Sequence, residues 1–216
     1  MKKCIRHISA AWILLLATAG GSIAQDIFPG YSKSEVSALH TAKNDASHSK
    51  EEQKVILIMN LARHNGTVFW DSIAAPYIRE NEMAASSYVK SLERDLKEVR
   101  DLPALKPDEI LRRAAQKHAV SSGRAGTLGH DSPAGSFESR LKHVLKTHHF
   151  VLENCDYGSG DALDIVMNLL IDEGIPGVGH RKNIFHPDTD AVGVSIAPHK
   201  SYDHNCVQVF GQLKSP

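Results

Sequence analysis

Two histidines of this chain lie in segments rich in glycine, where a flexible backbone could bring an imidazole into a cavity. His130 lies in "LGHDSP", and His180 lies in "IPGVGHRKNIFHP" directly after a long apolar run. Two acids belong to elements that should meet them: Glu153 at the end of a short apolar segment, and Asp172 or Glu173 at the end of the apolar run. Imidazoles and carboxylates together can transfer protons or bind a divalent metal such as zinc.

The spacing of these residues does not match a local catalytic or metal-binding motif. His130 and His180 are 50 residues apart, and the sequence has no H-E-x-x-H, C-x-x-C or G-x-S-x-G. His118 falls on the apolar stripe of an expected helix, where a core histidine bonded to the backbone is a better interpretation than a site ligand. An acid at the C-terminal end of a buried helix meets the negative end of the helix dipole. It therefore needs an imidazolium, a metal ion or a hydrogen-bonding loop as its partner.

The elements that would position these residues follow from apolar periodicity and from capping residues. A capping box, Ser49 with Glu52, indicates the start of the first helix, and Asp161 indicates the cap of the last one. Helices are predicted over residues 49–65, 83–99, 107–119 and 162–173. Strands are predicted over residues 150–154, 191–197 and 207–209. Helices that come first and strands that come later, with one helix between strands, predict an α+β layered domain.

The N-terminal segment has the order of a secretory signal peptide. Residues 1–24 combine Lys2, Lys3 and Arg6 with a short apolar stretch and a small-residue cleavage site before Gln25. A membrane anchor is the alternative, although the apolar stretch is too short to cross a bilayer. Residues 25–50 are polar and are predicted to form a loose, flexible arm, so the folded domain is expected over residues 51–214.

The net charge of the chain limits the classes of partner that it can bind. Removal of residues 1–24 takes away three basic residues and no acid, which leaves 22 Lys and Arg against 25 Asp and Glu. Such a chain has no strong basic field, and this argues against nucleic acid as the main partner. No second apolar run is long enough to span a membrane. We therefore expect a secreted protein, extracellular or periplasmic, without a stable membrane span once the signal is cleaved.

Two cysteines, Cys155 and Cys206, remain after removal of Cys4 with the signal peptide. An even pair in an exported protein predicts a disulfide. A catalytic thiol and two unpaired thiols are the alternatives.

Several segments resemble the bacterial CAP superfamily, the relatives of cysteine-rich secretory proteins, antigen 5 and plant pathogenesis-related 1 proteins. The similar segments occur in the family's order over about residues 53–213. They are "LARHNGTVF", "AAQKHAVSSG", "GHDS", "ENCDYG", "LLIDEGIPGVGHRKNIFHP", "VGVSIAPH" and "CVQVFG". The resemblance implies a three-layer α-β-α sandwich with a cavity lined by two histidines and two acids. Matched residue by residue, this tetrad corresponds to His130, Glu153, Asp172 and His180.

The resemblance also implies a function and shows one departure from the family. The second acid is usually Glu, whereas this chain offers Asp172, with Glu173 beside it. The implied function is a secreted binding or signalling module in which His130 and His180 bind a divalent cation such as zinc. Its further ligand would be a lipid, a sterol or a glycan, or a partner in the cell envelope. The alternatives are a metal-assisted hydrolase or peptidase, and a structural domain without metal.

Overall fold

The computed structural model describes residues 28–215, so the predicted signal peptide, residues 1–24, lies outside the described part. The middle layer of the molecule is a four-stranded sheet with the strand order β1-β3-β4-β2. β1 pairs parallel to β3, and the other neighbours pair antiparallel. β2 is therefore an edge strand of this sheet. The strands are β1 (Lys106–Pro107), β2 (His148–Gly158), β3 (Ala191–Pro198) and β4 (His204–Leu213).

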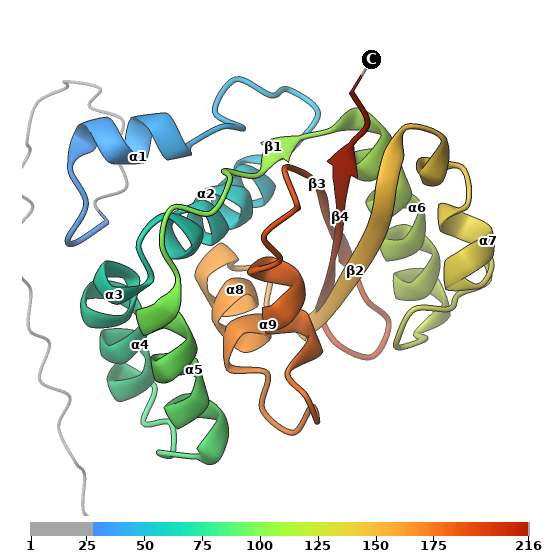
Figure 1. Cartoon of the computed structure of the whole chain (residues 1–216). Helices are drawn as coiled ribbons and strands as arrows, with labels where there is room; N and C mark the ends of the chain where they lie inside the picture. Colours follow the sequence, from blue (N-terminus) through green and yellow to red (C-terminus); the bar gives the residue numbers. More distant parts are fainter. Residues whose placement is uncertain (1–27, 216) are drawn as a thin grey trace, which may run out of the picture.

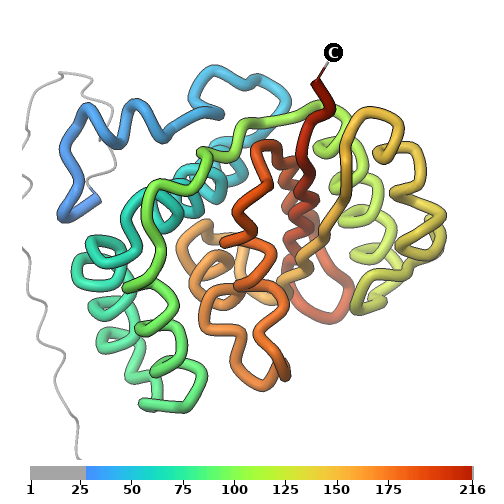
Figure 2. The backbone as a smooth tube through the Cα atoms, in the orientation of Figure 1, coloured from blue at the N-terminus to red at the C-terminus, as the bar shows by residue number. Residues whose placement is uncertain are grey.

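Helices cover both faces of the sheet (Figures 1 and 2). One face carries α2 (Lys50–His64), α8 (Ala162–Ile171) and α9 (Gly179–Ile184). Packed beside these lie α3 (Gly66–Phe69), the π-helix η1 (Trp70–Ala74), α4 (Ala75–Glu80) and α5 (Ser87–Glu98). The other face carries α6 (Glu109–Ala125), with α7 (Phe137–Leu141) and the 3-10 turn η2 (Val144–Lys146) nearby. The N-terminal helix α1 spans Lys33–Leu39.

Two apolar cores, one on each face of the sheet, follow from the alternation of side chains along the strands. Val192 and Val194 join the core beneath α2 and α8, whereas Ala191 and Ala197 join the core beneath α6. This arrangement confirms the predicted three-layer α-β-α sandwich. The capping box at the start of α2 is also present, since Ser49 and Glu52 exchange hydrogen bonds of 2.7 and 3.2 Å.

The prediction of a loose arm over residues 25–50 is wrong for residues 33–48. α1 has its own capping box, and Ala42 and His48 are buried. The side-chain amide of Asn60 in α2 donates to the carbonyl of Leu39 at 3.0 Å, and the backbone N–H of Val194 lies 3.2 Å from Nε2 of His48. These contacts attach the segment to both α2 and β3. The sequence did not indicate these contacts, because they are mostly polar and the segment has few large apolar residues.

The predicted Cys155–Cys206 disulfide is also wrong for this structure, in which both residues are free, buried thiols. In the register of β2 and β4, Cys155 is opposite Val207 and Cys206 is opposite Asp156. Successive side chains point to opposite faces of a sheet. Cys155 therefore packs beneath α6 and Cys206 beneath α2 and α8, with the sheet between them.

Candidate functional site

Helix α9 brings His180 to the free edge of β2. The side-chain amide of Asn183 donates to the carbonyl of Glu153 at 3.3 Å and to Oδ1 of Asn154 at 2.8 Å. Asn154 in turn donates to the carbonyl of His180 at 3.1 Å. The connection from α8 to α9 reverses direction through left-handed backbone at Gly177 and Val178, with φ of 82° and 47°. The glycine-rich approach in the sequence therefore directs His180 back toward the sheet.

His180 forms a pair with Asp172. Its Nδ1 lies 2.7 Å from Oδ1 of Asp172, and its backbone N–H donates to Oδ2 at 3.0 Å. Asp172 is the C-cap of α8 and has left-handed backbone, φ 57° and ψ 39°, a conformation that Asp tolerates better than most residues. Glu173 is exposed and accepts a hydrogen bond from Ser86 at 2.5 Å instead. Of the two acids considered from the sequence, Asp172 is the partner of His180.

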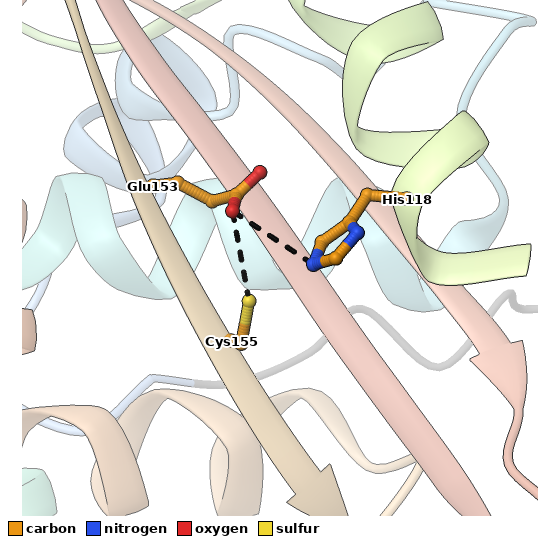
Figure 3. Close-up of side chains that lie close together, drawn as sticks. All are labelled: His118, Glu153 and Cys155. Atoms are coloured by element: carbon orange, nitrogen blue, oxygen red, sulfur yellow. Dashed lines mark hydrogen bonds and ion pairs between the residues drawn. The ribbon is translucent and has the colours of Figure 1, made fainter. Parts of the chain in front are cut away.

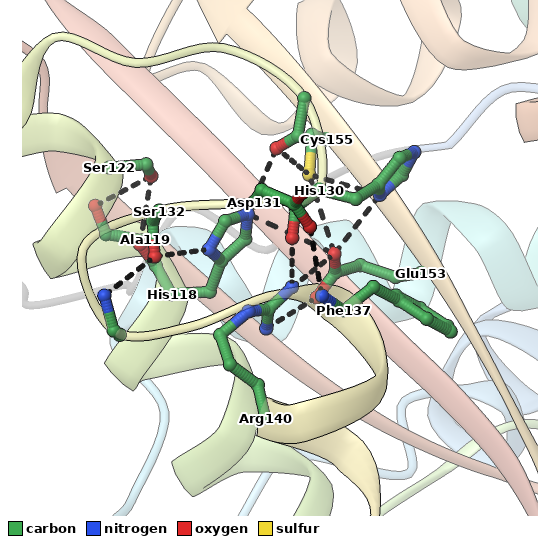
Figure 4. A network of polar contacts seen from close by, with 12 residues as sticks. His118, Ala119, Ser122, His130, Asp131, Ser132, Phe137, Arg140, Glu153 and Cys155 are labelled. Carbon is green, nitrogen blue, oxygen red and sulfur yellow. Dashed lines mark hydrogen bonds and ion pairs between the residues drawn. The ribbon is translucent and has the colours of Figure 1, made fainter.

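His130 forms the second imidazole–carboxylate pair, with Glu153. Its Nδ1 lies 3.0 Å from Oε1 of Glu153, which is in the middle of β2 and not at a strand end as expected. The guanidinium of Arg140 on α7 donates to both carboxylate oxygens, at 3.0 and 2.8 Å, and also to the carbonyl of His130 (Figure 4). Burial acts to raise the pKa of Glu153, but the hydrogen bonds from His130 and Arg140 outweigh it and hold this pKa below its usual value.

His118 lies behind this pair and is fully buried. Its Nε2 is 3.0 Å from the carbonyl of Gly129 and its Nδ1 is 3.2 Å from Oγ of Ser132, which confirms the interpretation as a core histidine bonded to the backbone. Burial lowers its pKa, so the neutral imidazole is favoured. The sequence did not indicate that Nε2 would also lie 3.8 Å from Oε1 of Glu153.

Three buried groups lie close enough to hold a metal ion: His118, Glu153 and Cys155, whose ligand atoms are within 4.8 Å of one another (Figure 3). Their donor chemistry does not suit a metal. Arg140 occupies both oxygens of Glu153, His118 is hydrogen-bonded through both nitrogens, and burial raises the pKa of the Cys155 thiol. A thiol must lose its proton to ligate a metal. This cluster is therefore a hydrogen-bonded network around Glu153.

His130 and His180 differ from His118 in having a ring nitrogen to spare. Each bonds a carboxylate through Nδ1, and among the described residues neither Nε2 has a hydrogen-bond partner. Their side chains are 46% and 21% exposed, so both nitrogens belong to accessible rings. A histidine that ligates a metal commonly fixes its other nitrogen on a carboxylate in this way. Each imidazole therefore has the donor chemistry of a metal ligand. Among the described residues, however, the side chains whose potential ligand atoms converge are those of His118, Glu153 and Cys155, and this group includes neither His130 nor His180.

A pocket of about 330 Å³ adjoins His180 along the free edge of β2 and the end of α8. Its wall is partly apolar, from Met83, Leu169, Ile171 and Ile175, and partly polar. The polar and remaining lining residues are Cys155, Asp156, Tyr157, Asn168, Asp172, Glu173 and His180.

The α-β-α sandwich with two histidine–acid pairs beside β2 defines a class of protein. Comparison with protein families identifies this class. The model of the CAP family, described as the cysteine-rich secretory protein family, matches residues 96–210. That range is more than half of the chain and includes His130, Glu153, Asp172 and His180. The chain belongs to the CAP family. Comparison with curated proteins gave no match.

Solved structures of similar proteins come from several sources. An extracellular protein of Bacillus anthracis with an SCP domain is 21% identical, with a TM-score of 0.46. The match covers 75% of this chain and 41% of that one. An outer surface protein of Borrelia burgdorferi is 21% identical, with a TM-score of 0.45 and coverage of 59% and 90%. NaASP2, solved with Zn²⁺, is 13% identical, with a TM-score of 0.44 and coverage of 78% and 87%. This chain therefore spans less than half the length of the Bacillus protein.

Proposed function

We propose that the protein is a secreted CAP module that binds one divalent cation through His130 and His180. Zinc is among the metals that imidazole ligands suit. The observation that carries this proposal is the pairing of each Nδ1 with a carboxylate while each Nε2 has no partner among the described residues. Glu153 and Asp172 would then orient the two ligands and not bind the ion themselves.

The affinity and its pH dependence follow from this ligand set. Two protein ligands leave the remaining coordination positions to water, so we expect weaker binding than in a four-ligand structural site. Imidazoles must be neutral to bind a metal ion, so zinc uptake should weaken in acidic solution.

Secretion is part of the proposal and rests on the predicted signal peptide of residues 1–24. Among residues 28–215, no helix is both long and apolar enough to cross a bilayer. Mass spectrometry of the exported protein is expected to find Gln25 at the N-terminus. An intact N-terminus that retains Met1 would contradict this part.

A hydrolase receives less support from the site. Glu153 has both oxygens bound by Arg140, and Asp172 has both oxygens bound by His180, so neither carboxylate is free to act as a general base. A structural domain without metal is the stronger alternative, because Arg140 already compensates the charge of Glu153.

The test is calorimetric titration of the purified protein with zinc at pH 7.5, before and after replacement of single histidines. His130→Ala and His180→Ala are each expected to abolish uptake, with circular dichroism showing an intact fold. His143→Ala, an exposed histidine beside η2, is the control and should bind like the parent. Absence of zinc binding at pH 8, or equal binding by all variants, would leave the structural domain as the function.

A further inference from the structure

Asp156 is a second buried acid of β2, and neither of the two histidine–acid pairs includes it. It is 7% exposed and lies opposite Cys206 in the register, so its side chain is on the α8 face of the sheet, away from Glu153. It also lines the 330 Å³ pocket. Its Oδ2 is buried and has no hydrogen-bond partner among the described residues. An unpaired carboxylate oxygen in such a position is costly unless a donor reaches it.

The other acids of the pocket have partners. Asp172 is bound by His180 through both oxygens, and Glu173 is bound by Ser86. Among the described residues, no Lys or Arg lines the pocket, whose charged and titratable groups are Asp156, Asp172, Glu173, His180, Cys155 and Tyr157. The pocket therefore has an excess of negative charge, and Asp156 is its buried acid with an oxygen that has no partner among the described residues.

The surroundings of Asp156 do not compensate its charge. Burial raises its pKa to about 7, against the lowering effect of hydrogen bonds from Asn168 and from the backbone N–H of Tyr157. Asp164 on α8 adds repulsion. A cationic ligand would supply the missing compensation.

The edge of β2 offers further acceptors beside Asp156. The carbonyl of Glu153 points away from β4, because it accepts a hydrogen bond from Asn183. Along an antiparallel strand the backbone groups of every second residue point to the same side, so those of Cys155 and Tyr157 also face the free edge. Both residues line the pocket. Carbonyl oxygens and a carboxylate together match a donor with several N–H groups.

We propose that this pocket binds a small organic cation, a primary ammonium group on a short apolar body, with the ammonium on Asp156. An ammonium has three donors and no acceptor. The apolar body would lie against Met83, Leu169 and Ile175, a wall that a hydrated metal ion could not use. The proposal shares the pocket edge at His180 with the proposed function, but it does not require a metal.

The experiment uses n-butylammonium as the probe, with n-butanol and butyrate as neutral and anionic counterparts, in NMR titrations of the purified protein at pH 8. Butylammonium is expected to bind more tightly than butanol, and butyrate is not expected to bind. Asp156→Asn should weaken butylammonium binding by about tenfold or more, the usual effect of losing a hydrogen bond to a charged group. Glu138→Gln, an exposed acid on α7, is the matched control and should bind like the parent.

A second measurement remains available even if Asp156→Asn does not fold. In the parent protein, butylammonium should shift the resonances of the Asn168 side-chain amide and of the Tyr157 N–H. Shifts confined to other regions would overturn the proposal. Equal binding of butanol and butylammonium, or unchanged binding by folded Asp156→Asn, would do the same. Saturation of an Asp156-dependent site by calcium without any response to butylammonium would identify an inorganic cation site instead.

The two proposals fail separately. In the His130→Ala variant, zinc uptake should be lost while Asp156-dependent amine binding persists, because His130 does not line the pocket. Amine binding without zinc binding in the parent protein would remove only the metal proposal. Zinc binding without amine binding would contradict only the proposal of an organic-cation site.

Discussion

Glu153 and Asp156 are buried carboxylates three residues apart on the same strand, yet they have opposite titration behaviour. Glu153 is 4% exposed and Asp156 is 7% exposed, so burial alone cannot explain the difference. On the α6 face, Arg140 and His130 donate to Glu153 and hold its pKa below the usual value. On the α8 face, no Lys or Arg of residues 28–215 lines the pocket beside Asp156, and burial raises the pKa of this acid to about 7. The hydrogen-bonding and charged partners on each face of the sheet therefore decide the charge state of its buried carboxyl group.

Removal of the cation from the Glu153 face should have the largest effect on stability. Arg140→Met leaves the buried Glu153 without its guanidinium partner, while the hydrogen bond with His130 remains. Loss of one partner of a buried ion pair typically costs about 3–5 kcal/mol. We expect a decrease of that size in the free energy of unfolding, measured by urea denaturation at pH 7. Arg140→Met/Glu153→Gln should recover part of it. A loss below about 1 kcal/mol for the single variant would show that the ion pair does not maintain this face.

Neutralisation of Asp156, the acid on the other face, should increase the free energy of unfolding and not decrease it. The folded protein keeps the proton of Asp156 up to a pH near 7, whereas the unfolded chain releases it near 3.8. The parent protein should therefore lose stability as the pH rises from about 4 through 7. Each pKa unit corresponds to about 1.4 kcal/mol, so Asp156→Asn should stabilise by on the order of 2–3 kcal/mol at pH 8, after allowance for its unpaired amide.

The same urea titrations at pH 4 and pH 8 check this sign. Near pH 4 the parent and Asp156→Asn should be almost equally stable, because the parent acid is then protonated in the fold. Asp203→Asn, an exposed acid before β4, should show no such pH-dependent gain. A stabilisation of the same size at both pH values would mean that Asp156 acts through packing and not through its charge.

Asp172 permits a third comparison, with its exposed neighbour Glu173. Asp172→Asn keeps a residue that tolerates left-handed backbone but removes the charge that faces His180. If His180 binds zinc, loss of this orienting carboxylate should weaken zinc binding by about 10- to 100-fold. Glu173→Gln should leave zinc binding unchanged in the same calorimetric assay. Equal losses in both variants would point to the general negative charge of the pocket and not to the Asp172–His180 contact.

Local features of the site could be predicted from the sequence, because short chain separations fix them. The pairing of His180 with an acid at the end of α8 is one example, since His180 comes eight positions after Asp172 and a glycine-rich turn lies between them. The capping box at Ser49 is another. Strand alternation likewise predicted the layered fold.

Long-range features could not be predicted, because they depend on which elements pack together. Nothing in the residues around Arg140 indicates that α7 would place its guanidinium on Glu153. That no Lys or Arg of the described part of the chain lines the pocket beside Asp156 is a property of the assembled α8 face, which no single segment reveals. The assignment of an even pair of cysteines to a disulfide failed for the same reason, since parity gives no information on which face each thiol occupies.

Replacement of the cysteines should have the smallest effect on the free energy of unfolding. It also tests whether the two thiols lie on opposite faces of the sheet. Cys155 and Cys206 belong to separate cores, so Cys155→Ala and Cys206→Ala should each cost roughly 1 kcal/mol, and the two losses should add within about 0.5 kcal/mol in the double variant. A disulfide would contribute roughly 2–5 kcal/mol, and then either single variant would lose as much as the double. Urea denaturation with and without reductant distinguishes the two cases. Unchanged stability on reduction is expected, because the sheet separates the thiols, whereas a clear loss would require β2 and β4 to pair in another register.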